Sequence, residues 1–105
     1  MAEFIELTDE NFESTIQSQE VALIDYMAGW CGSCRMAAPM FKKVATDLGL
    51  TIYKVDAEKN PKARSHAQIA NLPTIALVKK GKVVACLSTT KEAGLVAFLK
   101  EHGVP

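Results

Sequence analysis

The chain has 105 residues, 49% of them hydrophobic, which predicts one globular domain over residues 1–105 and argues against disorder. Twelve basic and twelve acidic residues give no net charge, so the composition offers no electrostatic basis for binding nucleic acid or an anionic membrane. No apolar stretch approaches the roughly 20 residues of a membrane span, and the N-terminus lacks the features of a signal peptide. We therefore expect a cytoplasmic protein.

Strands and helices alternate in the first half of the chain. Phe4–Leu7 is predicted to form a strand, and Thr8 is placed to cap the short helix that follows. Val21–Met27 is almost wholly apolar, as expected for a strand that is covered on both faces. A long helix is predicted from about Gly32 to Leu48, because apolar residues recur there on one face. This alternation indicates parallel strands with covering helices.

The second half of the chain ends in a hairpin and a helix. Thr51–Asp56 is predicted to form a strand, and residues 60–69 a helix. Residues 74–87 have the pattern of a hairpin, and Thr89 and Glu92 have the spacing of a capping box for a final helix. The complete order, βαβαβαββα, predicts an α/β fold with a central mixed sheet and helices on both faces.

The strongest chemical signal is a pair of cysteines, Cys31 and Cys34, where a buried strand passes into a helix. This spacing lets the two thiols meet across one helical turn. The first cysteine would lie among the unpaired N–H groups of the helix start, which favour thiolate over thiol. Lowering a cysteine pKa from about 8.5 to about 7 needs about 2 kcal/mol of such stabilisation. A thiolate is the attacking species in disulfide exchange, so the pair predicts redox chemistry.

The same pair also forms half of a possible zinc site, but a structural zinc ion needs four ligands. Cys86, His66 and His102 show no ligand-pair spacing, so we expect no metal. Cys86 is predicted to be a small buried hydrophobic residue in a strand. His66 is predicted to face solvent from a helix, and His102 to lie at a helix end.

Asp25 interrupts an apolar strand six residues before Cys31. A buried carboxylate has a raised pKa and can exchange a proton near neutral pH, so Asp25 could accept a proton from Cys34. The alternative is an ordinary exposed aspartate at the end of the strand.

Several motifs, spaced along the whole chain, resemble the thioredoxin family in matching order. They are Asp25–Met36, Ala38–Pro39, Lys54–Asp56, Asn60–Pro61, Leu72–Thr74 and Lys80–Gly81. The resemblance implies a thioredoxin fold and a protein-disulfide reductase. It also implies a protein with no bound cofactor, acting as a monomer.

The resemblance implies a role for each residue around the cysteines. Cys31 would be the exposed nucleophile that forms a mixed disulfide with a client protein, and Cys34 the sheltered thiol that resolves it. Lys54 would lie on the strand next to Asp25, although on its own it reads as a surface lysine. A thioredoxin reductase, using NADPH, would restore the dithiol.

The resemblance also implies a docking surface for clients. The Leu72–Pro73 peptide bond would be cis and would present the backbone of Leu72 beside the cysteines. An extended client segment could then pair with that backbone. Trp30, Gly29 and Asn71 would complete the surface, although core packing is an alternative for Trp30.

The sequence departs from the family at Ser33, where proline is usual between the cysteines. Gly32 and Ser33 are therefore expected to tune the redox potential. Serine adds an N–H and a hydroxyl that can stabilise the Cys31 thiolate, which predicts a protein somewhat less reducing than proline-containing relatives. Two other functions stay open: a thiol oxidase or isomerase, and a binding module without catalysis.

Overall fold

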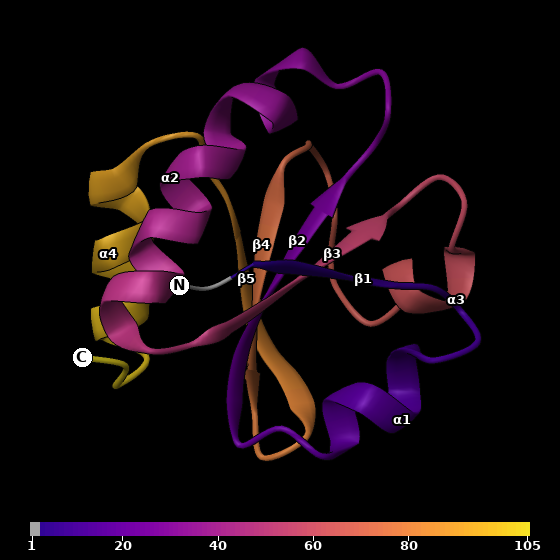
Figure 1. Ribbon diagram of the computed structural model, residues 1–105, viewed down its shortest axis with the longest axis horizontal. Coiled ribbons are helices and arrows are strands. Elements are labelled where there is room, and N and C mark those ends of the chain that lie inside the picture. Colours follow the sequence, from indigo (N-terminus) through magenta and orange to yellow (C-terminus); the bar gives the residue numbers. More distant parts are fainter. Residues whose placement is uncertain (1–2) are drawn as a thin grey trace.

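A five-stranded mixed sheet forms the centre of the molecule, in the computed structural model that describes residues 3–105 (Figure 1). The strand order is β1-β3-β2-β4-β5, with β2 in the middle. β1, β3 and β2 are parallel, whereas β4 and β5 are each antiparallel to their neighbours. The strands are β1 (Phe4–Leu7), β2 (Val21–Met27), β3 (Thr51–Asp56), β4 (Thr74–Lys79) and β5 (Lys82–Ser88). The predicted element order and mixed sheet are confirmed.

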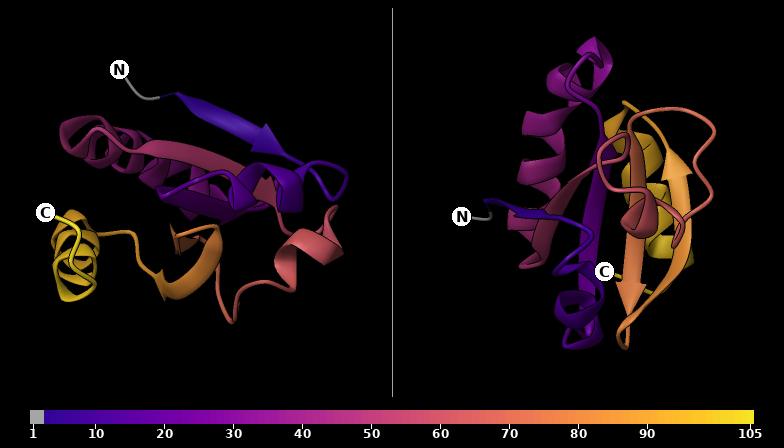
Figure 2. Two further views of the ribbon diagram at one scale, coloured as in Figure 1. Left: turned by 90° about the horizontal axis from the view of Figure 1, so that it is seen from below. Right: turned by 90° about the vertical axis from the view of Figure 1, so that its right-hand side faces the viewer.

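Helices cover both faces of this sheet (Figures 1 and 2). They are α1 (Phe12–Gln17), α2 (Gly32–Leu48), α3 (Pro61–Arg64) and α4 (Glu92–Glu101). The alternation of side chains along β2 divides the core into two clusters. Ile24 and Tyr26 face the cluster that contains residues of α1 and α3, whereas Leu23 faces the cluster of α2 and α4.

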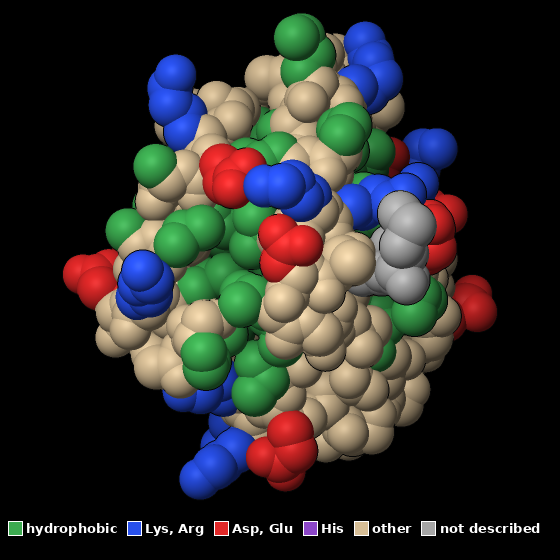
Figure 3. Space-filling model, turned by 60° about the vertical axis from the view of Figure 1, so that its left-hand side comes forward, with side chains coloured by type: hydrophobic (Ala, Val, Ile, Leu, Met, Phe, Trp, Pro, Cys, Tyr) green, Lys and Arg blue, Asp and Glu red, His purple; other side chains and the backbone are tan. Residues whose placement is uncertain are grey.

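α2 and α4 lie side by side on one face of the molecule, which is seen in Figure 3 with hydrophobic side chains set among charged ones. Phe41 of α2 and Leu99 of α4 belong to the same buried cluster. An exposed ion pair between Lys43 and Glu92, at 3.0 Å, joins the two helices. In residues 3–105, no helix is both long and apolar enough to cross a membrane.

Two glycines with positive φ allow the backbone turns that end α2 and connect β4 to β5. Gly49 caps α2 in the left-handed conformation at φ 67°, where glycine has no steric cost. Gly81 has φ 79°, and a Cβ atom there would lie only 2.9 Å from the carbonyl oxygen of Gln17. The hairpin turn therefore has no room for a side chain at this position.

The starts of α1 and α4 differ from the prediction. Thr8 does not cap α1; its backbone carbonyl forms a turn with Phe12, and the helix begins one residue after Asn11. Thr89 does not form a capping box with Glu92, because its hydroxyl accepts a hydrogen bond from the Lys91 N–H, two residues on. A backbone turn at Thr8 and a side-chain turn at Thr89 thus take the place of the predicted helix caps.

α3 is also shorter than predicted, because it ends at Arg64 rather than near Ile69. Beyond it, the chain leaves the helix so that Ile69 and Leu72 can pack against the core. Two contacts fix α3 to the rest of the fold. The buried Tyr26 hydroxyl donates to the Ala63 carbonyl at 2.8 Å, and the Ala63 N–H donates to Asp9 Oδ1 at 2.8 Å.

Candidate active site

The two cysteines lie where β2 passes into α2. Cys31 is the N-cap residue of α2 and Cys34 lies one helical turn later, so their Cα atoms are 5.3 Å apart. The two side chains form a disulfide. This position follows from the sequence, since the apolar β2 strand is buried and Gly32 begins a long amphipathic helix against it. The predicted cysteine pairing is confirmed.

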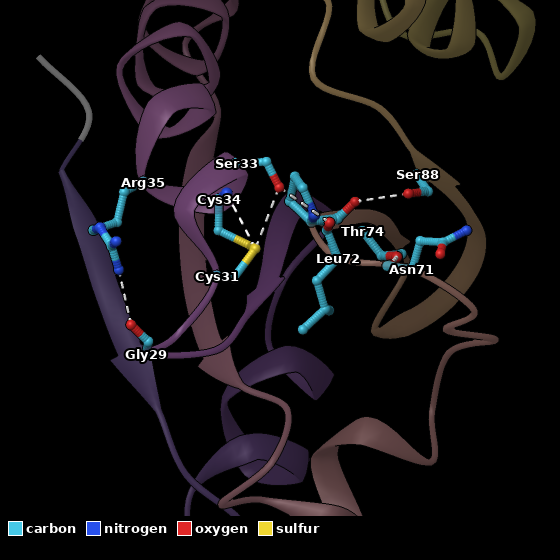
Figure 4. Close-up of a disulfide and its surroundings, with 10 residues drawn as sticks. Gly29, Cys31, Ser33, Cys34, Arg35, Asn71, Leu72, Thr74 and Ser88 are labelled. Carbon is cyan, nitrogen blue, oxygen red and sulfur yellow. Dashed lines mark hydrogen bonds between the residues drawn. A yellow bond between two sulfur atoms is a disulfide. The ribbon is translucent and has the colours of Figure 1, made fainter.

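Two hydrogen-bond donors surround the Cys31 sulfur (Figure 4). The Cys34 N–H donates to Cys31 Sγ at 3.2 Å. The Ser33 hydroxyl oxygen lies 3.4 Å from the same sulfur, and this hydroxyl also donates to the Leu72 carbonyl at 3.5 Å, so its single proton has two acceptors within reach. The sequence predicted that the Ser33 N–H would reach this sulfur, but the N–H that donates to Cys31 Sγ is that of Cys34. These groups and the positive end of the α2 dipole are placed to stabilise a negative charge on this sulfur once the disulfide is reduced.

Cys31 is less exposed than expected for an attacking thiol. Cys31 is 4% exposed and Cys34 is 3% exposed, so burial does not distinguish the two residues. They pack with Ala28, Met27 and Leu72. The difference between them lies in their surroundings, because Cys31 lines a surface groove and Cys34 does not.

This feature, which we call the Cys31 groove, is lined by residues 30–33 at the start of α2, residues 69–72 before β4, Glu58 and Arg64. Trp30 is 66% exposed, which excludes core packing for its indole. Asn71 and Leu72, both expected at a docking surface, lie here, and the Leu72–Pro73 peptide bond is cis.

Hydroxyl groups hold the backbone on both sides of Pro73. Thr74 Oγ1 donates to the Asn71 carbonyl at 2.6 Å, and Ser88 Oγ donates to the Pro73 carbonyl at 3.0 Å. Ser88 is the last residue of β5. Its hydroxyl therefore links β5 to the loop that lines the Cys31 groove.

Asp25 is buried in the centre of the sheet, on β2, with 3% of its surface exposed. Its Oδ1 atom accepts no hydrogen bond from any residue between 3 and 105. Burial raises the pKa of Asp25 from 3.8 to about 7, and the charge of Lys54 opposes this shift. Lys54 is the register partner of Asp25 on β3, as expected. The position of Asp25 excludes an exposed aspartate at the strand end.

Two further residues differ in part from the prediction, and a third agrees with it. Cys86 is half-buried rather than buried, because it lies on the edge strand β5, and its thiol donates to the Gln68 carbonyl at 3.3 Å. His66 is exposed, as predicted, but it lies beyond α3 rather than on a helix. Its ring packs on Phe12, and its Nε2 atom lies 3.4 Å from a carboxylate oxygen of Glu13. His102 caps the end of α4, as expected.

In the described part of the chain, no group of three or more potential ligands could hold a metal ion. Three residues near the cysteines were not predicted as part of the site: Glu58 and Arg64, which line the Cys31 groove, and Arg35, which bonds to the Gly29 carbonyl. No sequence motif marked Glu58 or Arg64. They reach the Cys31 groove only because the loop after β3 and the early end of α3 place them there. Arg35 directly follows Cys34 in the sequence, and this position next to a cysteine of the pair is the feature that could have identified it.

Comparison with known proteins places the chain in a family. The thioredoxin family model matches residues 3–101. Thioredoxin of Mycobacterium tuberculosis is 35% identical over 100 residues, which cover 92% of this chain and 84% of that protein. Thioredoxin 2 of Chlorobaculum tepidum is 38% identical over 103 residues, covering 94% of each.

A solved structure supports the fold independently. Thioredoxin f2 of Chlamydomonas reinhardtii superposes with a TM-score of 0.85 at 22% identity, covering 98% of this chain and 99% of that one. The mixed sheet with helices on both faces is thus the thioredoxin fold. Together with the Cys31–Cys34 disulfide, these matches support dithiol–disulfide exchange. The chain belongs to the thioredoxin family of disulfide oxidoreductases.

Proposed function

We propose that the protein reduces disulfides of client proteins, with Cys31 as the nucleophile. The observation that carries this assignment is the setting of Cys31 Sγ, which has two hydrogen-bond donors at the N-terminus of α2 and lies at the Cys31 groove. Thiolate is the nucleophile in exchange, and these donors favour it. Cys34 lies outside the groove and is the resolving thiol.

The reaction transfers two electrons from the cysteine pair to the client. The Cys31 thiolate attacks one sulfur of the client disulfide, which forms a mixed disulfide and releases the other client sulfur as a thiolate that takes a proton. Cys34 then loses its proton and attacks Cys31 Sγ. The Cys31–Cys34 disulfide forms, and the second client sulfur leaves and takes a proton.

Asp25 is the acceptor for the Cys34 proton in this proposal. A carboxyl group with a pKa of about 7 exchanges protons efficiently near neutral pH. Lys54, its partner on β3, keeps that pKa from rising further. Asp25→Asn is therefore expected to slow the exchange without abolishing it, because both sulfur atoms remain.

Clients dock in the Cys31 groove as extended segments. Trp30 lines the groove from the turn before α2, next to Gly29, and Asn71 and Leu72 line it from the loop before β4, next to Pro73. The Leu72 carbonyl can accept a hydrogen bond from the client backbone, as in strand addition. Ser33 and Gly32, at the start of α2, tune the potential of the pair.

A thioredoxin reductase returns the protein to the dithiol form with electrons from NADPH. The protein itself binds no cofactor in this cycle and acts as a single domain over residues 1–105, as a monomer. A reducing compartment such as the cytoplasm suits the cycle, because the dithiol must be regenerated there.

Reduction of insulin by the protein, with NADPH and a bacterial thioredoxin reductase, tests the proposal. Cys86→Ser provides a background in which Cys31 and Cys34 are the only cysteines, and we expect this variant to retain activity. Adding Cys31→Ser to that background should abolish insulin reduction. Retained activity in that double variant would contradict the assignment. Replacing the reductase by dithiothreitol separates failure of the exchange from failure of reductase recognition.

A further inference from the structure

The turn before α2 carries Trp30 but gives its indole little support. The Cys31 N–H donates to the Ala28 carbonyl at 3.1 Å, so Gly29 and Trp30 form the corners of a turn. The indole makes neither a hydrogen bond nor an aromatic ring contact with any other residue in 3–105, and Trp30 is 66% exposed. The backbone of the turn therefore determines where the indole lies.

Arg35 closes this turn from the helix side. Its Nη1 donates to the Gly29 carbonyl at 2.8 Å, six residues back along the chain. The side chain passes the first residue of α2, since Nη2 lies 3.9 Å from the position of a Cβ atom at Gly32. In Figure 4 this bond and the Ser33–Leu72 contact lie on opposite sides of the cysteine pair. A bond from a charged donor is stronger than one between neutral groups.

We propose that Arg35 is a positioning residue, which holds the Gly29–Trp30 turn so that the indole lines the Cys31 groove. The inference rests on the proposed docking of clients in that groove. An alternative role, direct hydrogen bonding to the thiolate, does not fit the contacts. The donors to Cys31 Sγ are the Cys34 N–H and the Ser33 hydroxyl, whereas Arg35 reaches a backbone carbonyl.

Trp30 is the only tryptophan in the sequence, so it reports on the turn without a label. Time-resolved fluorescence anisotropy of Arg35→Ala should show a larger amplitude of fast local motion than in the unchanged protein. Arg35→Lys keeps the charge and one donor and should restore part of the difference. Lys42→Ala is the matched control, because it removes another cation of α2 whose side chain pairs with Glu3 and does not line the Cys31 groove.

Loss of the Arg35 side chain should weaken client binding, which KM reports, and leave the exchange step, which kcat reports, nearly unchanged. Arg35→Ala is expected to raise KM for insulin about three- to tenfold and to change kcat less than about twofold, which corresponds to loss of one contact in binding. The pH profile of Cys31 alkylation by iodoacetamide should stay unchanged. This readout separates positioning of the turn from an effect of charge on the thiolate.

Two results would overturn the inference. One is an Arg35→Ala protein whose Trp30 anisotropy equals that of the unchanged protein. The other is a shifted alkylation profile with an unchanged KM, which would show that Arg35 acts through its charge. If the unchanged protein fails to reduce insulin, the proposed function fails, yet the anisotropy comparison still decides whether Arg35 holds the turn.

Discussion

The hydroxyl oxygen of Ser33 lies 3.4 Å from the sulfur of Cys31. In the disulfide that sulfur carries no proton, so the hydroxyl is the only possible donor between the two groups. Its strength as a donor matters most after reduction, when the sulfur becomes a thiolate and accepts a stronger, charge-assisted hydrogen bond. Ser33 is therefore expected to stabilise the reduced form more than the oxidised form.

Ser33→Ala should therefore make the protein more reducing. Loss of about 1.4 kcal/mol of preference for the dithiol lowers the potential of this two-electron couple by about 30 mV. Ser33→Pro should shift it in the same direction, because proline also lacks the hydroxyl. Equilibration of each variant with a glutathione buffer measures the potential. An unchanged or higher potential in both variants would show that the hydroxyl does not control the couple.

Asp25 should make stability depend on pH. Its pKa is raised from 3.8 to about 7 in the fold, so between these values the folded state holds a proton that the unfolded state has lost. The free energy of unfolding then falls as pH rises from about 4 through about 7. With about 1.4 kcal/mol for each pKa unit, the loss reaches about 4 kcal/mol.

Urea unfolding of Asp25→Asn at pH 4 and pH 8 measures this effect. The variant cannot ionise at residue 25, so its stability relative to the unchanged protein should increase from pH 4 to pH 8. The comparison across pH removes the constant cost of burying the amide. A difference that is the same at both pH values would contradict the raised pKa.

Tyr26→Phe should destabilise the fold through α3. The Tyr26 hydroxyl donates to the Ala63 carbonyl at 2.8 Å, and its removal leaves that acceptor without this partner, at a cost of about 1–2 kcal/mol. Tyr53→Phe is the control, because Tyr53 is also buried but its hydroxyl donates to no other residue in the described range. Equal losses in urea unfolding for the two variants would show that the hydrogen bond contributes nothing specific.

The sheet was predictable because its signals are strong and local. The apolar run Val21–Met27 is long enough to define a strand buried on both faces, and it became the central strand β2. The starts of α1 and α4 could not be predicted in the same way, because Thr8 and Thr89 can satisfy neighbouring backbone groups in turns as well as in caps.

The candidate site also has features that the sequence predicts and features that depend on the fold. The spacing of Cys31 and Cys34 is a local property of one helical turn, so the sequence alone predicted their pairing. The burial of Cys31 depends on Leu72, which is far away in the chain and reaches the cysteines only through the fold. The Arg35–Gly29 bond depends on the direction of a long flexible side chain, which residue spacing does not determine.

The most direct test of the account is to trap the mixed disulfide. Cys34→Ser in the Cys86→Ser background leaves Cys31 as the single thiol, and after reaction with oxidised insulin it should accumulate a complex joined through Cys31, identified by mass spectrometry. The reciprocal protein, Cys31→Ser with Cys86→Ser, should form little or none at neutral pH. A complex that forms readily through Cys34 and poorly through Cys31 would contradict the assignment of the nucleophile.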